Sequence, residues 1–438
     1  MKTWTTAAIL VLIPAGLMMH TETGKLVDPF ADEHDELGRA VAIGGGRVIA
    51  GSQFDDDVGS ASGSATIYHR GYSEGVAQMN RVAKVIGSDT SSNDRFGFAV
   101  AINDNYALVG APFGDRNMGR TDVGLAYIFE YYETEPDVIE WSQRRRLTSI
   151  DGAADDGFGW AVAMSNTVAV VGAPRADQLG EDTGAVYVFE RDGNNWPLSA
   201  TLFADPAADQ ALFGSSVAID GERIVVGAFL DEHMGEQTGA VYVFERVVVD
   251  DEPEWMMQQR LTASDGNPFD EFGFAVDISG DLLVVGAPDD DDASDIAGAA
   301  YVFEFMGAVK GIGGGWVEQA KLIASDAGIE EEFGSSVGIS DGVVLIGKHW
   351  DDALGTDAGS AYVFQSVDGI WTEQSRLTAS DGAAGDEFAF AVGIDRLQGI
   401  VGARFHDSEG ENAGAAYFFA PAQLLGDELF DNGFENLD

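Results

Sequence analysis

Apolar residues along this chain fall into short segments that recur seven times in the same order. The units align on a Phe-Gly pair, such as Phe272-Gly273, or on a close variant of it. The second residue of the pair stands at positions 38, 97, 159, 214, 273, 334 and 389, so the unit repeats every 55 to 62 residues. Self-similarity at a near-constant period indicates one supersecondary unit copied along the chain.

Each unit contains four segments with β character, illustrated here by the fifth unit. Residues 272–276 alternate between large and small side chains, as a strand does. Residues 282–285 are apolar at both parities, which predicts a strand buried on both faces. Residues 298–303 are rich in aromatic and β-branched side chains, which favour strands. Trp316 and Leu322 are six positions apart, so we expect them on one face of a fourth strand.

Seven units of four strands predict an all-β protein, a seven-bladed β-propeller of four-stranded antiparallel blades. The ends of the sequence indicate how the ring closes. Lys25-Leu26 matches the end of a fourth segment, as at Lys321-Leu322, whereas no fourth segment follows residues 415–419. We therefore expect the N-terminal strand to complete the seventh blade and remove the exposed edges. An open solenoid, which would have to cap both ends, is the alternative.

The two termini lie outside the repeats. An apolar stretch from Ala7 to Met19 is too short to span a bilayer but suits the hydrophobic region of a secretory signal. We predict a signal peptide over residues 1–23, a propeller over 24–419 and a C-terminal tail over 420–438. The mature protein is then expected to be secreted or at the cell surface, with no membrane span.

The recurring motifs together resemble a known repeat. Gly-Ala-Pro stands intact at residues 110–112, 172–174 and 286–288, between the Phe-Gly pair and a Gly-x-x-Tyr-x-Phe segment. This combination is similar to the FG-GAP repeat of integrin alpha subunits and bacterial surface proteins, over about residues 25 to 419. The resemblance implies extracellular binding or adhesion, often with calcium, and no general catalytic activity.

One departure limits what the resemblance implies about calcium. Integrin-like blades hold calcium in an Asp-x-Asp-x-Asp-Gly loop between their first and second strands. Here that connection is short, as at residues 278–281. Calcium sites therefore have to be argued from other loops of this protein.

The charge of the protein narrows its possible partners. It carries 24 Lys and Arg against 74 Asp and Glu, a formal charge of −50. Such a surface argues against binding nucleic acid or anionic lipid, which needs cationic side chains. Self-repulsion also leads us to expect a monomer. The sequence has no cysteine, which excludes disulfides and thiolate chemistry.

Acidic residues recur in two loops of the repeat and are candidate calcium ligands, because calcium takes six to eight oxygens. The first set occupies two positions, seven residues and two residues before the Phe of the Phe-Gly pair. The second set follows Gly-Ala-Pro or its equivalent. Asp is also a common turn residue, and runs of acids are commonly solvated loops, so these interpretations stay open. The candidates are Asp265, Asp270, Asp381 and Asp386 in the first set, and Asp55, Asp57, Asp289, Asp291, Asp295, Asp351 and Asp357 in the second.

Residues that break the repeat are better candidates for ligand binding than residues that maintain it. Units six, seven and one depart from Gly-Ala-Pro and are neighbours in a closed ring. The departing residues and their neighbours are Gln53, Lys348, His349, Trp350, Arg404 and His406. A cationic and aromatic patch of this kind would suit an acidic group or a sugar. Decay of the repeat with local pairing to nearby Asp is the alternative.

No Ser/His/Asp order, zinc-protease motif or phosphate loop occurs in the sequence. We therefore expect a binding or adhesion protein with a protein or carbohydrate ligand, and not an enzyme. A secreted propeller hydrolase acting on glycan or another polymer is the alternative, since propellers also carry enzymes. A structural component of the cell surface is a third possibility.

Overall fold

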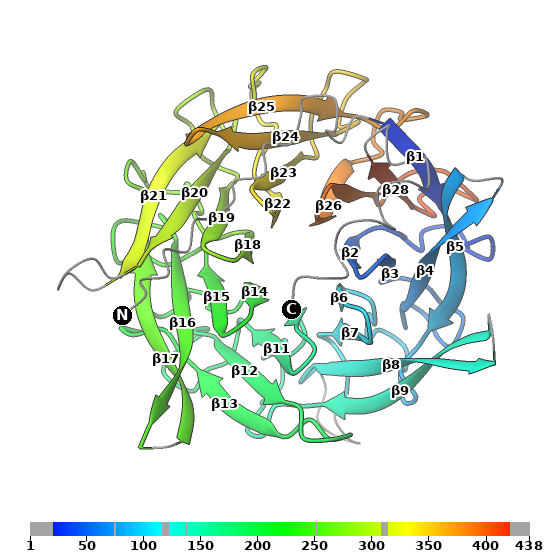
Figure 1. Ribbon diagram of the computed structural model, residues 1–438, viewed down its shortest axis with the longest axis horizontal. Helices are drawn as coiled ribbons and strands as arrows, with labels where there is room; N and C mark the ends of the chain where they lie inside the picture. The colour runs from blue at the N-terminus through cyan, green and yellow to red at the C-terminus, as the bar shows by residue number, and fades with distance from the viewer. Residues whose placement is uncertain are drawn as a thin grey trace, which may run out of the picture.

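The computed structural model describes residues 21–73, 76–115, 122–135, 138–250, 252–307 and 314–420. Within these residues the polypeptide forms 28 strands, β1 to β28, and no helix. The strands form seven four-stranded antiparallel sheets that stand around one axis like blades (Figure 1). The predicted all-β, seven-bladed propeller is confirmed.

Each blade runs from an inner strand beside the axis to an outer strand at the rim. Blade 1 contains β2 (Ala40–Gly44), β3 (Arg47–Ser52), β4 (Ser64–Ser73) and β5 (Val76–Val85). Blade 2 contains β6 (Ala99–Ile102), β7 (Tyr106–Ala111), β8 (Leu125–Glu135) and β9 (Val138–Leu147). Blade 3 contains β10 (Val162–Met164), β11 (Val168–Ala173), β12 (Ala185–Glu190) and β13 (Leu198–Leu202). Blade 4 contains β14 (Ser216–Asp220), β15 (Arg223–Ala228), β16 (Ala240–Val249) and β17 (Glu252–Leu261).

The remaining blades follow the same order until the ring closes. Blade 5 contains β18 (Val276–Ser279), β19 (Leu282–Ala287), β20 (Ala299–Met306) and β21 (Gly315–Leu322). Blade 6 contains β22 (Ser336–Ser340), β23 (Val343–Lys348), β24 (Ser360–Val367) and β25 (Ile370–Leu377). Blade 7 contains β26 (Phe388–Asp395), β27 (Gln398–Ala403), β28 (Ala415–Ala420) and, as its outer strand, β1 (Thr21–Leu26).

The closure expected from the two ends of the sequence is confirmed. Lys25 lies opposite Tyr417 in the pairing of β1 with β28, and Leu26 lies opposite Ala416. Because β1 begins at Thr21, the predicted boundary at residue 23 falls inside this strand. Residues 1–20 of the predicted signal peptide, and residues 421–438 of the predicted tail, lie outside the described residues.

In most blades the Phe-Gly pair precedes the inner strand. In blade 5 the inner strand β18 begins at Val276, so the prediction that the strand begins at Phe272 is wrong. Gly273 has a φ of +97°, in the left-handed region, so the backbone turns here instead of extending. A Cβ on Gly227 of blade 4 would lie 2.0 Å from the Gly273 carbonyl oxygen. The two glycines therefore allow the backbones of neighbouring blades to touch.

The Phe of the pair fills the space between inner strand and blade core. Phe272 is fully buried, and its ring centroid lies 5.4 Å from Tyr301 and 6.0 Å from Phe303, both on β20. Both contacts are edge-to-face, an arrangement that aromatic quadrupoles favour. Burying a Phe ring in six of the blades, and Leu37 in blade 1, supplies apolar stabilisation without a single central core.

The expectation that Trp316 and Leu322 share one face of the fourth strand is also wrong. A β-bulge shifts the register of β20 and β21, so that Val302 faces Ala320 and Phe303 faces Glu318. One extra residue reverses the alternation of side chains beyond it. Trp316 accordingly packs with the cluster shared by blades 4 and 5, and Leu322 with the cluster shared by blades 5 and 6.

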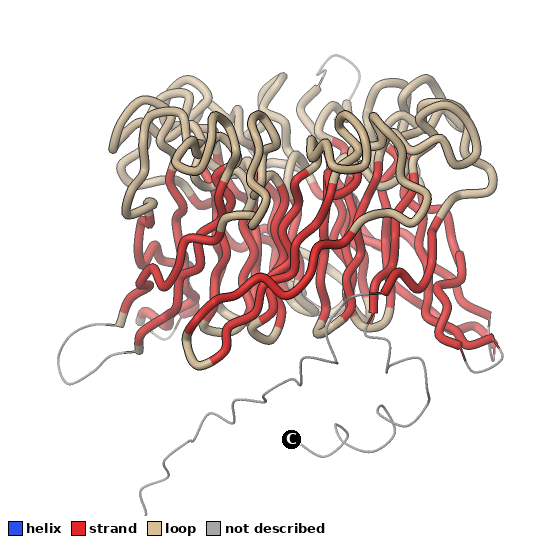
Figure 2. The backbone as a smooth tube through the Cα atoms, turned by 90° about the horizontal axis from the view of Figure 1, so that it is seen from above, coloured by secondary structure: helices blue, strands red, loops and turns tan. Residues whose placement is uncertain are grey.

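The two ends of the propeller differ. Connections from second to third strands, and from one blade to the next, are long loops at one end, which we call the loop face (Figure 2). The opposite end carries short turns within each blade. No helix in the described part of the protein is long and apolar enough to cross a bilayer.

Candidate functional site

Below the loop face, several of the predicted calcium ligands lie around a basic side chain of their own blade. In blade 5 the Tyr301 hydroxyl donates hydrogen bonds to Asp265 (2.8 Å) and Asp290 (2.7 Å). The Lys321 ammonium, near the end of β21, lies 3.0 Å from Asp265, 2.8 Å from Asp290 and 2.6 Å from Asp292. The carboxylates therefore surround an ammonium group that the protein itself supplies. We call this arrangement of Tyr, Asp and a basic side chain the blade clamp.

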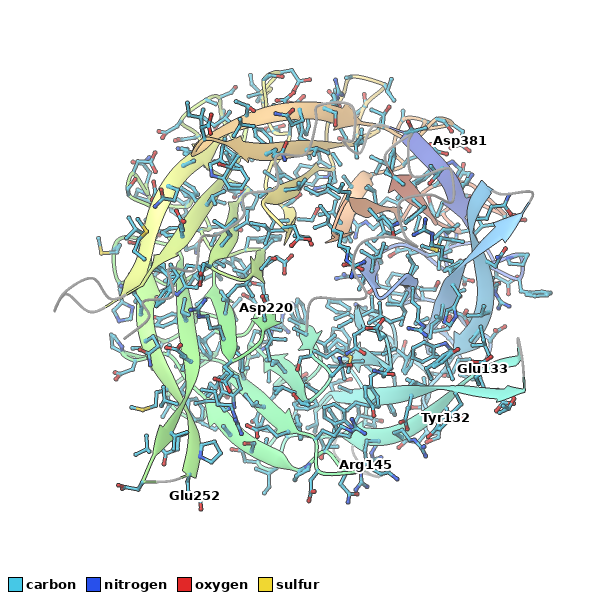
Figure 3. The ribbon with its side chains drawn as sticks, in the orientation of Figure 1. Tyr132, Glu133, Arg145, Asp220, Glu252 and Asp381 are labelled. Atoms are coloured by element: carbon cyan, nitrogen blue, oxygen red, sulfur yellow. The ribbon has the colours of Figure 1, made fainter. Side chains whose placement is uncertain are left out.

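The blade clamp recurs with variations around the ring. The basic side chain belongs to the residue before the last Leu or Val of the outer strand. Blade 3 is the exception, with Thr201 at this position. In blade 7 the basic residue is Lys25 of β1, 2.9 Å from Asp381, which lies beside β1 in Figure 3. The other ion pairs are Lys84 with Asp55 and Asp57, Arg146 with Asp89, Arg260 with Asp231, and Arg376 with Asp326 and Asp351.

These ion pairs change the charge states inside the clamp. Burial opposes the charged forms, but hydrogen bonds to Asp290, Asp292 and Asp265 raise the pKa of Lys321 above its ordinary range. The same kind of contact outweighs burial at Asp265, whose pKa is lowered by Lys321 and Tyr301. The ammonium and the carboxylate are therefore both charged at neutral pH.

The clamps bear on the calcium prediction. At Asp55, Asp265, Asp351 and Asp381 a Lys or Arg nitrogen already lies among the carboxylate oxygens, so an additional cation would be repelled. The residues as arranged do not fit calcium at these positions.

The other predicted calcium ligands have different surroundings. Asp270 and Asp386 are buried, and each accepts a hydrogen bond from a backbone N–H three residues earlier. Burial raises the pKa of Asp270 to about 6. Asp289, Asp291, Asp295 and Asp357 lie in the loops after the second strands, whereas Asp57, in the same loop of blade 1, pairs with Lys84 of the clamp at 2.6 Å. Among described residues, no three His, Asp or Glu side chains converge as a metal site would require.

The structure divides the predicted ligand patch into two groups. Lys348 is fully buried and belongs to the blade 6 clamp, where it pairs with Glu331 and, at 3.0 Å, with Asp351. His406 is buried in the blade 7 clamp, 3.4 Å from the Lys25 ammonium. These two side chains do not reach the loop face.

The other patch residues do gather near the axis. Each of three contacts the Glu that precedes the Phe-Gly pair, or its equivalent, in its own blade. Gln53 donates to Glu36 at 2.8 Å, Arg404 pairs with Glu387 at 2.7 Å, and His349 lies 3.6 Å from Glu332. Trp350, partly exposed, lies beside His349 with a centroid separation of 5.0 Å.

Sequence reasoning missed the residues that connect this group around the axis. These residues are Phe390, Arg39, Phe98 and Trp160, each directly after the Phe-Gly pair or its equivalent. We call the four side chains the axial arc. The Arg39 guanidinium lies 3.8 Å from the Phe98 centroid and 5.5 Å from that of Phe390. The rings of Phe98 and Trp160 are 4.7 Å apart. Four side chains from blades 7, 1, 2 and 3 thus form one continuous row of contacts.

Further cations stack along the axial arc. Arg404 lies 3.6 Å from the Phe390 centroid, and Arg175 lies 5.6 Å from Trp160. Arg95 stacks between Phe54 and Phe113, at 5.1 and 4.5 Å. Guanidinium groups over aromatic faces are a common way to build a recognition surface. The sequence signal was available, because the position after Phe-Gly also varies between units.

A serine and a histidine meet beside the axial arc. Ser335 Oγ lies 2.9 Å from His349 Nδ1, and Glu332 lies on the other side of the ring. Burial and the charge of Arg404 lower the pKa of His349 to about 3. The imidazole is therefore neutral and weakly basic, which suits a hydrogen-bond acceptor better than a general base.

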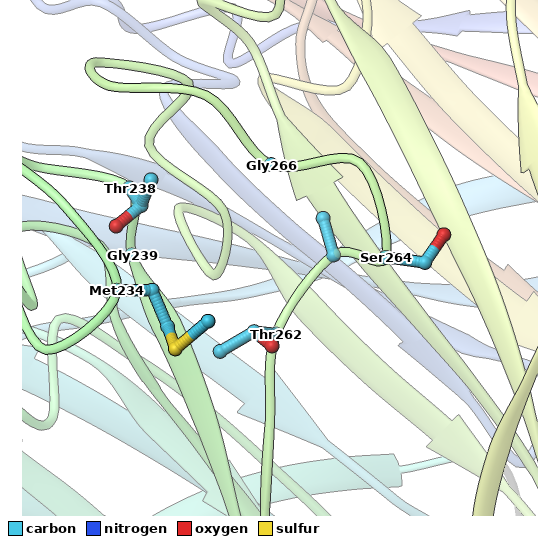
Figure 4. A pocket seen from close by; sticks show the side chains of 7 residues that line it. Met234, Thr238, Gly239, Thr262, Ser264 and Gly266 are labelled. Carbon is cyan, nitrogen blue, oxygen red and sulfur yellow. The ribbon is translucent and has the colours of Figure 1, made fainter.

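The loop face also carries a small cleft between blade 4 and the segment that leads into blade 5 (Figure 4). It has a volume of about 100 Å³ and is lined by Met234, Thr238, Thr262, Ser264 and Gly266, among others. Ligand pockets for small molecules typically enclose roughly 300–1,000 Å³. The cleft is too small to be the main site.

Fold and repeat geometry define the protein as a seven-bladed β-propeller with antiparallel blades. The FG-GAP repeat family model matches residues 20–68, 79–129, 141–189, 196–244, 255–303, 316–364 and 371–419. The protein therefore belongs to the FG-GAP repeat family. Each matched segment contains the outer strand of one blade and three strands of the next, which is why the first begins with β1 and the last ends with β28.

The sequence is also similar to two integrin alpha-7 proteins. It is 26% identical to the Rattus norvegicus protein over 284 residues, covering 60% of this sequence and 23% of that one. It is 26% identical to the Mus musculus protein over 264 residues, covering 56% and 21%. The match thus spans less than a quarter of the length of these relatives.

Among solved structures, Chaetomium thermophilum Sqt1 aligns with a TM-score of 0.47 at 14% identity, covering 88% of this protein and 83% of that one. A putative 6-phosphogluconolactonase from Bacteroides fragilis aligns with a TM-score of 0.47 at 9% identity, covering 79% and 86%.

Proposed function

We propose that this protein is an extracellular or cell-surface binding protein that recognises a protein ligand through its loop face. The observation that carries the proposal is the axial arc, where aromatic and guanidinium side chains from four blades meet at one end of the ring. These residues differ from blade to blade, whereas the residues that hold the blades together repeat. Binding of a partner accounts for such variation, and scaffold maintenance does not.

Exposed side chains elsewhere on the loop face favour a protein ligand over a carbohydrate. Loops of the same face carry exposed apolar side chains, including Phe30 (71% exposed), Ile150 (72%) and Ile329 (67%). Aliphatic side chains and Arg beside aromatic anchors are typical of protein interfaces. The similarity to integrin alpha-7 supports the same kind of ligand.

The remaining parts of the proposal follow from the sequence. We propose a monomer that is exported by the signal peptide. Calcium stays a proposal for those Asp side chains of the loops after the second strands that lie outside the clamps, and its test is a calcium-selective rise in the thermal unfolding midpoint relative to magnesium and chelator.

A hydrolase is the second candidate, favoured by the contact of Ser335 with His349. The lowered pKa of His349 weighs against it, because a general base works best with a pKa near the working pH. Ser335 is also largely buried. We therefore propose binding and not catalysis, and no labelling of Ser335 by a fluorophosphonate probe is expected.

The proposal is tested by binding the purified protein to an array of extracellular proteins and an array of glycans. The loop-face variant is Phe30→Ser, Ile150→Ser and Ile329→Ser combined. The matched control is Val248→Ser with Ile370→Ser, two side chains that are 74% and 66% exposed at the opposite end. All five side chains are exposed, so neither variant should unfold.

We expect the parent to bind protein targets, the loop-face variant to lose about tenfold or more in affinity, and the control to stay unchanged. Equal binding by both variants, or binding to glycans alone, would contradict the proposal.

A further inference from the structure

Arg39 differs from its equivalents in every other blade. The residue after the Phe-Gly pair is aromatic or Ser at Phe98, Trp160, Ser215, Phe274, Ser335 and Phe390. Arg39 alone brings a charge to this position. It therefore places a cation in the middle of the axial arc, between the rings contributed by blades 7 and 2.

The charge of Arg39 is not neutralised by an ion pair within the described residues. Among these residues, the one hydrogen bond of its guanidinium runs from Nη1 to the Phe98 carbonyl oxygen, at 3.2 Å. Its Nε is buried without a hydrogen-bond partner among these residues. Burial and the charges of Arg404 and Arg95, opposed in part by the charge of Glu36, lower the pKa of Arg39 to about 9, so the group is still protonated at neutral pH. An aromatic sandwich holds this guanidinium in place without satisfying it.

The carboxylates near Arg39 already have donors. Glu36 accepts a hydrogen bond from Gln53 at 2.8 Å. Glu387 pairs with Arg404, whose guanidinium stacks on the same Phe390 ring that Arg39 approaches. Glu36 and Glu387 therefore each have a donor other than Arg39. The free hydrogen-bonding capacity beside them belongs to the Arg39 guanidinium, whose Nε has no partner among the described residues.

We propose, resting on the proposed function, that the protein partner presents a carboxylate to Arg39, either from an Asp or Glu side chain or from its own carboxyl terminus. The rings of Phe98 and Phe390 lie against the guanidinium, and its Nε has no hydrogen-bond partner among the described residues. A carboxylate matches the fork of a guanidinium and forms charge-assisted hydrogen bonds with it. The net charge of −50 repels acidic groups from the protein as a whole. Because salt screens that repulsion over distance, the positive charge of Arg39 selects one acidic group at close range.

The test uses an array of peptides in which each Asp- or Glu-containing peptide is paired with its Asn or Gln counterpart. Peptides that bind are then measured in solution by calorimetry. The variants are Arg39→Ala and Arg39→Lys. Arg39→Lys keeps the positive charge and removes the forked N–H donors of the guanidinium, and it still tests the inference if Arg39→Ala does not fold. Arg191→Ala is the control, because it removes one guanidinium stacked on Tyr106, away from the loop face.

We expect acidic peptides to bind and their amide counterparts to lose about tenfold or more, with a similar loss for Arg39→Ala, a smaller one for Arg39→Lys and none for Arg191→Ala. Equal binding of acidic and amide peptides, unaffected by the Arg39 variants, would overturn this inference and leave the proposed function standing. Competition by phosphate, sulfate or oligogalacturonate where no carboxylate peptide binds would also overturn it. The proposed function fails separately if the loop-face variant binds its protein targets as the parent does.

Discussion

In every blade except blade 3, a basic residue near the end of the outer strand pairs with the Asp side chains of the clamp. Lys321 lies among three carboxylates, and Arg376, Arg260 and Lys84 occupy the same place in their blades. The recurring acids could be predicted from the sequence as a group that needs a cation. That the cation is an internal ammonium could not, because Asp265, Asp290 and Lys321 lie on separate segments that only the folded blade brings together.

Lys321→Met should destabilise the protein by about 2–3 kcal/mol, because buried Asp290 loses its countercharge while Asp265 and Asp292 remain partly solvated. The variant should also gain a calcium-selective rise in its thermal midpoint, since three carboxylates are left without an ammonium. The measurement is thermal unfolding of parent and variant with calcium, with magnesium and with chelator.

Thr201→Met is the matched control, because Thr201 holds the same position in blade 3 without a basic side chain. We expect little change for this variant. If Lys321→Met and Thr201→Met lower the stability of the protein by the same amount, the clamp is not a source of stability.

The ligand patch shows why residue type alone misassigns a role. Lys348 and Arg39 are both unrepeated cations, yet Lys348 is buried among acids and Arg39 lies between aromatic rings. Both positions were visible as departures from the repeat. Only the neighbours in space, which the sequence does not order, separate the structural cation from the candidate ligand contact.

At the scale of elements, the outer strands show a limit of reading alternation from sequence. Trp316 and Leu322 are an even number of residues apart, which predicts one face. The bulge between the pairs Val302–Ala320 and Phe303–Glu318 places them on opposite faces. Nothing in residues 316–322 marks the bulge, because it depends on pairing with β20. The second strands, apolar at both parities, were predicted correctly.

The loops between blades carry a second electrostatic feature. The Asp two residues before Phe accepts a backbone hydrogen bond inside its loop at Asp94, Asp156 and Asp270, and burial raises the pKa of each to about 6. In the unfolded state these groups titrate near 4. Between about pH 4 and 6 the folded protein therefore holds protons that the unfolded protein releases.

Stability should consequently fall as pH rises through this window. The contribution of these groups is fully present below about pH 4 and lost above about pH 6. Below pH 4 the opposite effect begins, because Asp231, Asp265 and Asp351, whose pKa values are lowered by their clamps, become protonated. We expect a higher thermal midpoint at pH 5 than at pH 7.5, measured at fixed ionic strength.

Asp270→Asn separates this effect from the general relief of negative charge. It keeps an oxygen for the Asn267 N–H and removes the titration, so it should raise stability at pH 7.5 by about 1–2 kcal/mol and flatten the pH dependence. Asp291→Asn, at an exposed Asp of the same blade, is the control for losing one charge. The explanation is wrong if both variants behave alike.

At the scale of the whole molecule, ring closure assembles the proposed site. Arg39 belongs to blade 1 and Phe390 to blade 7, so they meet only because β1 completes the sheet of β28. The closure was predictable, since Lys25-Leu26 repeats the end of an outer strand and the last unit lacks one. The side chains that meet at the axis could not be predicted in the same way. Their positions depend on the turn at the Phe-Gly pair, whereas the alternation of large and small side chains predicts a strand there.

The closure can be measured directly in a protein that has no cysteine of its own. Glu22 of β1 accepts hydrogen bonds from the Ser380 backbone N–H at 2.9 Å and its hydroxyl at 3.1 Å. The variant Glu22→Cys with Ser380→Cys should react with a short bismaleimide within one molecule, giving a looped product on a denaturing gel. Ser325, which binds Glu373 in blade 6 in the same way, provides the control pair Glu22→Cys with Ser325→Cys. Cross-linking of the first pair alone is the result that a closed ring predicts, and equal or absent cross-linking of the two pairs would contradict it.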